Sequence, residues 1–265
     1  MIEIEPYPGK FNIKKGDSVF FADRESLSIC GMEPQDNSVL TDLSSIKASS
    51  VIKMNRLRLR VKHPFGFLSE KIGSLLSIYD LFGVELIAET DGTVEGRSAE
   101  IDNSKISTAV VTLSDKGSIG QRDDLTGPAV QKIVKNISDF SDLYIIPDDK
   151  NLLDYLVREL ADKKRYDIII TNGGTGVSPR DVTADVTETL IERRLGGFEQ
   201  AMMAASIKET YKAVLSRSVV GIRGRSLIIN LPGSPRAAAT NLSSVVDAIV
   251  HLIKKLNGDP TECGS

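Results

Sequence analysis

Residues 166–181 read YDIIITNGGTGVSPRD and decide the fold. The first six residues form an apolar, isoleucine-rich run, which is typical of a strand buried on both faces of a parallel sheet. Three glycines follow, in a loop that lets backbone amides approach a bound anion. Ligands of such sheets bind at the carboxyl ends of the strands, so this stretch predicts both the sheet and the edge that carries its site.

Three further apolar runs lie on either side of this strand in the chain. They cover residues 106–113 (ISTAVVTL), 143–146 (LYII) and 226–231 (SLIINL), and each predicts a buried strand. Apolar residues with helical spacing lie between them at 152–160, and one long stripe covers 242–256. Strands alternating with helices predict an α/β domain with a doubly wound, mostly parallel sheet.

Four loops follow the predicted strands, and they should converge at one edge of the sheet. They are 114–120 (SDKGSIG), 147–149 (PDD), 172–181 (NGGTGVSPRD) and 232–235 (PGSP). The third loop is the strongest candidate for a phosphate cradle, with the hydroxyl of Thr175 as a donor, although a plain tight turn explains its glycines equally well. It matches neither a Walker P-loop nor GxGxxG.

Aspartates in these loops predict metal-assisted chemistry. A carboxylate at Asp181 would repel a phosphate in the cradle unless a cation lay between them, which suggests Mg²⁺. The alternative is that Asp181 or Thr183 caps a helix over 183–190. Asp148 and Asp149 pose a similar choice, since one should cap the helix that begins near residue 150 and leave the other for chemistry.

The remaining composition narrows the function classes. The loops hold no thiol, histidine or Ser-His pair, so positioning and charge neutralisation, as in phosphoryl or nucleotidyl transfer, are the expected source of rate. The 265 residues carry a net charge of -3 and 5% aromatic residues, which argues against a nucleic-acid partner. Two cysteines, Cys30 and Cys263, and no long apolar run predict a reduced, cytoplasmic protein without a membrane partner.

The first hundred residues differ from the rest in their hydrophobic pattern. Short alternating runs such as 56–62 (RLRLRVK) predict a smaller, mainly β domain. Its arginine row either binds an anion or is a solvated strand face. The small polar residues of 97–105 predict a boundary that separates a domain of residues 1–103 from one of residues 104–258.

Six short motifs in residues 106–256 together resemble the MogA/MoaB family of molybdenum cofactor biosynthesis. The motifs are SD at 114–115, IPD at 146–148, TxGGTG at 171–176 followed by RD at 180–181, GFE at 197–199, LSR at 215–217 and LPGSP at 231–235. The resemblance implies a MoaB/Mog-like molybdopterin-binding fold. It also implies an enzyme that transfers AMP from Mg-ATP to the terminal phosphate of molybdopterin.

The resemblance assigns a role to each motif residue. Asp148 and Asp181 match the family's catalytic carboxylates, with Mg²⁺ held near them. The positions matching nucleotide and phosphate binding are Ser114, Asp115, Gly173, Gly174, Thr175 and Gly176. The positions matching molybdopterin binding are Ser206, Ser216, Arg217, Pro232, Gly233 and Ser234. Asn172 departs from the usual Thr or Ser beside the cradle, and we expect this change to matter little.

The resemblance also implies partners. Members of this branch are usually homotrimers, and the same fold occurs as a domain of the molybdate-insertion enzyme, which is an expected partner. Residues 83–101 weakly resemble the end of a MOSC domain without the cysteine that precedes it, which indicates a binding or docking role. The alternative function is a non-catalytic molybdopterin carrier or sensor, but mere binding of an anion would gain nothing from two carboxylates.

Overall fold

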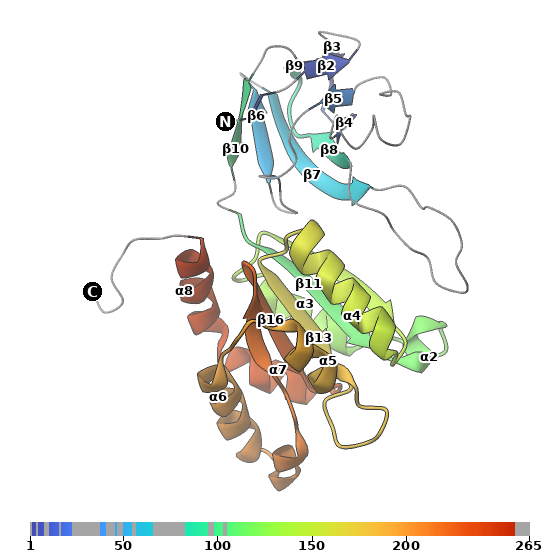
Figure 1. Cartoon of the computed structure of the whole chain (residues 1–265), viewed down its shortest axis with the longest axis vertical. Helices are drawn as coiled ribbons and strands as arrows, with labels where there is room; N and C mark the ends of the chain where they lie inside the picture. The colour runs from blue at the N-terminus through green and yellow to red at the C-terminus, as the bar shows by residue number, and fades with distance from the viewer. Residues whose placement is uncertain are drawn as a thin grey trace. The chain divides into compact units, whose positions relative to one another are not determined.

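The structure is a computed structural model. The chain folds into two compact units, Met1–Lys105 and Ile106–Ser265 (Figure 1). It describes residues 2–3, 5–7, 11–15, 17–22, 38–40, 46, 50–54, 57–65, 83–94, 98–102 and 105–257. Cys30, Arg56 and Cys263 lie outside this part of the chain. No helix in the described ranges is long and apolar enough to cross a membrane.

A six-stranded sheet forms the centre of the second unit. Its order is β12 (Phe140–Ile146), β11 (Ser107–Leu113), β13 (Ile168–Asn172), β16 (Ser226–Leu231), β15 (Val220–Arg223) and β14 (Arg193–Arg194). The first four strands are parallel, and the last two are antiparallel to their neighbours. Ile168, Ile169 and Ile170 are fully buried, as the apolar run predicted.

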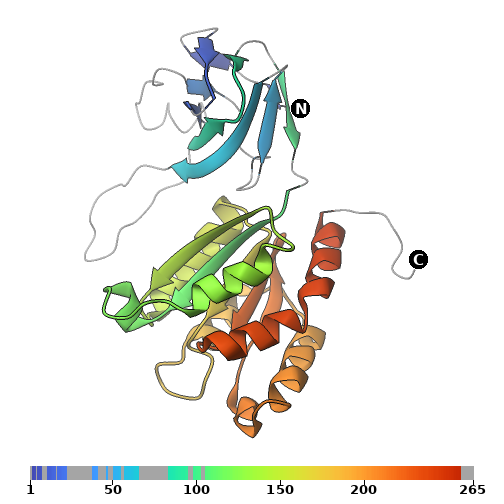
Figure 2. The same cartoon turned by 180° about the vertical axis from the view of Figure 1, so that it is seen from behind.

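Helices cover both faces of this sheet. Viewed from the two sides in Figures 1 and 2, α4 (Lys150–Arg158) and α5 (Thr183–Leu190) lie on one face, and α3 (Thr126–Val134) and α7 (Pro235–Ser243) lie on the other. The remaining helical elements are α2 (Asp115–Ser118), η1 (Glu159–Lys163), α6 (Gly196–Ile207), η2 (Tyr211–Leu215) and α8 (Val246–Leu256). The predicted doubly wound α/β architecture is confirmed.

The expectation of a buried strand at 143–146 is wrong. β12 is the edge strand of the sheet, and its residues alternate in burial. Leu143 is 39% exposed and Ile145 is 42% exposed. An apolar run does not tell an edge strand from a central one, because that difference depends on which neighbours the strand finds.

The single helix expected from the stripe 242–256 is two helices. α7 ends at Ser243, and α8 begins at Val246. The Ser244 hydroxyl donates to the Asn241 carbonyl, and serine side chains that bond the backbone in this way favour helix ends. The stripe still predicted burial correctly, because Leu242, Val245, Ile249 and Ile253 all join the core.

The first unit is mainly β. Its eight-stranded sheet has the order β1 (Ile2–Glu3), β10 (Ser98–Asp102), β6 (Val51–Met54), β7 (Leu57–Phe65), β8 (Gly83–Ala88), β4 (Ser18–Ala22), β5 (Ser38–Leu40) and β2 (Glu5–Tyr7). A separate pair joins β3 (Phe11–Ile13) to β9 (Gly92–Val94). Arg58 and Arg60 both pair with Glu89, at 3.6 and 3.1 Å, which favours a solvated strand face over an anion site.

Candidate functional site

The four predicted loops meet in one cleft at the carboxyl edge of the sheet. The cleft has a volume of about 570 Å³, and its walls are mainly polar. Its lining includes Ser114, Asp148, Gly174, Asp181, Gly233 and Ser234. Each loop therefore contributes at least one residue, and the predicted convergence is confirmed.

Asp148 does not cap α4, because its neighbour Asp149 does. Asp149 caps α4, since its side chain accepts from the Leu152 amide at 2.8 Å. Asp148 is half-buried in the cleft, and its own carboxylate accepts from the Asp115 amide at 3.3 Å. Partial burial and the nearby charge of Asp181 raise the pKa of Asp148 above its ordinary 3.8. A bound cation would relieve this repulsion.

Asp181 is also open to the cleft. One of its oxygens accepts from the Ser178 amide at 2.8 Å. No side chain caps α5, so the alternative of a capping role for Asp181 or Thr183 is wrong. Gly176 lies against the carboxylate, because a Cβ there would come within 2.8 Å of it.

Asp115 contacts protein groups and is absent from the cleft lining. Its carboxylate accepts from the Asp148 amide at 3.0 Å and pairs with Arg180. These bonds tie the first loop to the second and third loops. Ser114, by contrast, lines the cleft, and its oxygen accepts from the Gly117 amide at 3.1 Å.

Close packing within the protein requires glycine at two positions of the turn. Gly173 and Gly174 have positive φ values of 99° and 62°. A Cβ on Gly173 would lie 2.7 Å from the Leu113 carbonyl, and one on Gly174 would lie 2.4 Å from the Thr183 hydroxyl. The loop reaches α5 only after residues 177–182, although the Thr183 amide donates back to the Gly174 carbonyl at 3.0 Å.

The predicted phosphate loop lines two different cavities, and Gly173 is in the lining of neither. Gly174 lines the cleft, whereas Thr175 and Gly176 line a smaller, mainly apolar pocket of about 260 Å³. Of the predicted molybdopterin residues, Ser206, Ser216 and Pro232 line the pocket, and Gly233 and Ser234 line the cleft. Arg217 belongs to neither lining, and its guanidinium bonds to the segment between the two cavities.

A hydrogen-bond chain along the wall of the cleft joins Asp124, Thr112 and Asn172, all of which line it. Asp124 accepts from the Thr126 and Gly127 amides at 2.9 Å and from the Thr112 hydroxyl at 2.6 Å. Thr112 accepts in turn from the Asn172 amide group at 3.1 Å. This order points the Asn172 side-chain oxygen away from Thr112, and the oxygen has no hydrogen-bond partner in the part of the chain that the structure describes. The unusual asparagine is a sequence signal for this chain of bonds, and the small effect expected of it stays a prediction.

The carboxylates fit a magnesium site that is completed by substrate. No group of three or more His, Cys, Asp or Glu residues in the described segments could hold a metal ion. Mg²⁺, however, is commonly held by one or two carboxylates together with substrate phosphates. Asp148 and Asp181 supply that number, in a cleft large enough for a nucleotide.

Comparison with known proteins agrees with this geometry. The family model "Probable molybdopterin binding domain" matches residues 109–251. The chain belongs to the MogA/MoaB family of molybdopterin-binding domains. The match lies within the second unit, so the MOSC resemblance of the front residues stays a prediction.

Individual relatives align with the same region. The molybdopterin adenylyltransferase of Helicobacter pylori (strain ATCC 700392 / 26695) is 34% identical over 157 residues, which cover 58% of this chain and 89% of that protein. Gephyrin of Dictyostelium discoideum is 38% identical over 57% of this chain and 22% of its own length. The crystal structure of MoaB from Thermus thermophilus covers 59% of this chain and 99% of its own, with 36% identity and a TM-score of 0.53.

Proposed function

We propose that the chain is a molybdopterin adenylyltransferase, which transfers AMP from Mg²⁺-ATP to the terminal phosphate of molybdopterin. The observation that carries the proposal is the pair of carboxylates, Asp148 and Asp181, that line one cleft; partial burial, together with the charge of Asp181, raises the pKa of Asp148. Such a pair has a use when a cation and phosphates bind between its members. Several relatives that are 34% identical bear the name of this enzyme.

Asp148 and Asp181 would hold Mg²⁺, which would supply charge neutralisation for the nucleotide phosphates. Ser114 would bind those phosphates, and Ser234, from the molybdopterin motif, would bind the terminal phosphate of molybdopterin in the same cleft. Each of these serine oxygens accepts a backbone amide bond, from Gly117 and Ala237 respectively, so each hydroxyl proton is available to a phosphate oxygen. Asp115 would keep Asp148 in place through the Asp148 amide.

The apolar pocket would hold the pterin part of molybdopterin. Its lining includes Ser206, Ser216, Pro232 and Ala237. A terminal phosphate oxygen of molybdopterin would attack the α-phosphorus of ATP, and the bond from that phosphorus to the bridging oxygen would break. Pyrophosphate would leave, and adenylyl-molybdopterin would form. The chain's contribution is to position the two substrates and stabilise the developing charge.

The test is AMP transfer by purified protein with molybdopterin, Mg²⁺ and ATP labelled at the α-phosphate. We expect labelled adenylyl-molybdopterin and one pyrophosphate per transfer. Tight molybdopterin binding with no transfer above background would instead indicate the carrier or sensor function.

Assembly and domain organisation belong to the same proposal. We expect a homotrimer, which sedimentation equilibrium would measure, and binding to the molybdate-insertion enzyme, which co-purification would detect.

Removal of residues 1–103 should leave adenylylation intact if the boundary lies near residue 103. A truncated chain that fails to fold would place the boundary elsewhere.

A further inference from the structure

Arg217 bonds to both ends of one loop. Its Nε donates to the Gly176 carbonyl at 2.7 Å, and one terminal nitrogen donates to the Asp181 carbonyl at 2.5 Å. The four residues between these two carbonyls, 177–180, are all exposed. The same guanidinium pairs with both oxygens of Asp185 in the first turn of α5, at 2.6 and 3.2 Å.

These bonds use most of the hydrogen-bonding capacity of the guanidinium. A guanidinium has five N–H donors, and four hydrogen bonds join this one to Gly176, Asp181 and Asp185. The Arg217 amide adds a bond to the Thr175 carbonyl at 2.8 Å. A side chain engaged in this way has little capacity left for a substrate phosphate.

We propose that Arg217 is a positioning residue that holds Asp181 in the cleft, and that it does not bind molybdopterin directly. This inference rests on the proposed function. By fixing the carbonyls of Gly176 and Asp181, Arg217 sets the path of the loop and with it the direction of the Asp181 carboxylate. The loop also separates the cleft from the apolar pocket, because Gly176 lines the pocket and Asp181 lines the cleft.

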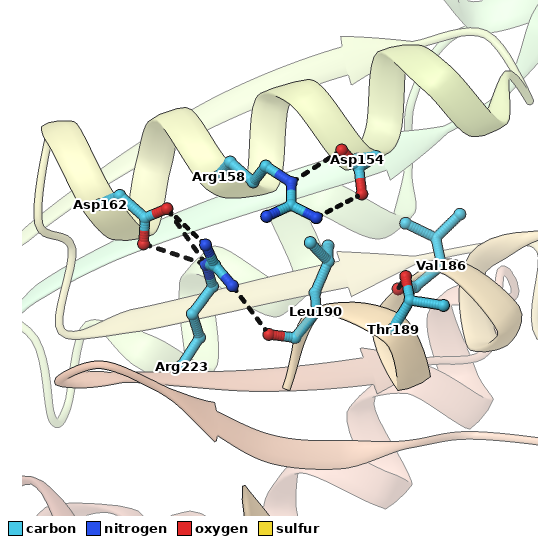
Figure 3. Close-up of polar contacts among 7 residues, drawn as sticks. All are labelled: Asp154, Arg158, Asp162, Val186, Thr189, Leu190 and Arg223. Carbon is cyan, nitrogen blue, oxygen red and sulfur yellow. Dashed lines mark hydrogen bonds and ion pairs between the residues drawn. The ribbon is translucent and has the colours of Figure 1, made fainter. Parts of the chain in front are cut away.

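Arg223 offers a matched control at the other end of α5. It pairs with Asp162 at 2.6 Å and donates to the Leu190 carbonyl at 3.1 Å, as Figure 3 shows. The two arginines thus make the same kinds of bond, to a carboxylate and to the backbone, with two carbonyls for Arg217 and one for Arg223. Arg223 is the less exposed of the two, at 18% against 37%, so its removal should cost at least as much stability.

The experiment compares Arg217→Ala, Arg217→Lys, Asp185→Asn and Arg223→Ala in the full chain. Steady-state adenylylation gives kcat and KM for each, calorimetry gives affinity for Mn²⁺ with a non-hydrolysable ATP analogue, and a melting curve gives Tm. We expect Arg217→Ala to lower kcat by about tenfold to a hundredfold, because small displacements of a reacting group have effects of this size. Its KM for molybdopterin should stay within about threefold of wild type, a range set by loss of positioning without loss of binding.

The other variants test the cause of that loss. Arg217→Lys should not rescue kcat, because an ammonium group cannot reproduce the planar array of donors to two carbonyls and a carboxylate. Asp185→Asn should lower kcat less than Arg217→Ala, and the double variant should be no worse than Arg217→Ala alone. Arg223→Ala should lower Tm as much as Arg217→Ala does and leave kcat unchanged.

Failure of this inference is distinct from failure of the proposed function. An active wild type, with Arg217→Ala raising the KM for molybdopterin and keeping kcat, would overturn the positioning role in favour of direct binding. A second outcome is an inactive wild type that still binds Mn²⁺ with the ATP analogue. If Arg217→Ala then binds Mn²⁺ at least tenfold more weakly than wild type, the transferase function is overturned and the positioning role is retained. A wild type that binds no Mn²⁺ with the analogue would overturn both.

Discussion

Two aspartates flank β13 in the chain, Asp167 just before the strand and Asp181 in the loop that follows it, and they have opposite surroundings. Asp167, just before the strand, is 5% exposed, and its carboxylate accepts from both the amide and the hydroxyl of Ser107 at 2.9 Å. Asp181, beyond the other end, accepts from the Ser178 amide with one oxygen and lines the cleft. The amino end is closed by bonds within the protein, and the carboxyl end leaves acceptors for a ligand.

This difference separates polar groups that stabilise the fold from polar groups that serve a site. A buried carboxylate with backbone donors locks neighbouring elements together, and its loss exposes unpaired donors. Two carboxylates that face one cleft and repel each other cost stability unless a ligand binds. The contrast between Asp167 and Asp181 can be tested by substitution at each end.

The largest expected effect is on activity at the carboxyl end. Asp181→Asn keeps an oxygen for the Ser178 amide and removes the charge, so turnover should fall by at least about a hundredfold because a metal-binding charge is lost. The unfolding free energy should be unchanged or slightly higher. Steady-state adenylylation and chemical denaturation measure the two quantities, and an equal loss of molybdopterin affinity would mean that Asp181 has a structural role.

The glycine turn should be the most sensitive position for stability. Gly174→Ala places a Cβ at positive φ and against the Thr183 hydroxyl, which should cost about 2 to 3 kcal/mol of unfolding free energy. Gly197→Ala in α6 is the control, since a Cβ there meets nothing within 4 Å, and it should be neutral or stabilising by up to about 1 kcal/mol. Similar losses at both positions would contradict the steric explanation.

At the amino end, the expected loss is of stability alone. Asp167→Ala leaves the buried Ser107 amide without its acceptor and should cost about 1 to 3 kcal/mol, while kcat of the folded protein stays at the wild-type value. Asp167→Asn retains an acceptor oxygen and should cost less. A fall in kcat without a fall in stability would remove the distinction between the two ends.

The smallest effect concerns the pH dependence of stability. The pKa of Asp148 is raised above 3.8 by desolvation and by Asp181, so ionisation of Asp148 opposes folding. The penalty is fully present above the raised pKa and disappears below the ordinary value. Asp148→Asn should therefore raise Tm near neutral pH and not below pH 3.8. Asp123→Asn changes an exposed residue of the same cleft and is the control, which should leave Tm unchanged at both pH values. A gain that persists in acid would exclude charge as the cause.

Much of the architecture could be predicted because it depends on local patterns. The isoleucine run predicted a buried central strand, and the helix over 183–190 has its predicted bounds. Asp149 caps α4, which is one of the two outcomes that the doublet of Asp148 and Asp149 allowed. Parallel strands share a carboxyl edge, so the place of each loop after a predicted strand was enough to predict that the four loops meet.

Other features depend on neighbours that are distant in the chain. The exposure of Leu143 follows from the position of β12 at the sheet edge. The break after Ser243 is by contrast a local feature, because the Ser244 hydroxyl bonds to the Asn241 carbonyl within a continuous apolar stripe. The loop that reads as one phosphate cradle divides between two cavities, because its two sides meet different elements.

Periodicity, glycine placement and the alternation of strands with helices are contained in short stretches of the chain, and together with the family motifs they were enough to predict the α/β class, the site edge and the candidate carboxylate pair. The contacts of Asp115, Asn172 and Arg217 could not be predicted in this way. Each depends on a partner at least 32 residues away, which is Asp148, Thr112 or Asp185 respectively. Only folding brings those donors and acceptors within hydrogen-bond distance. That is why an arginine in a molybdopterin motif turns out to bond to the loop that carries Asp181.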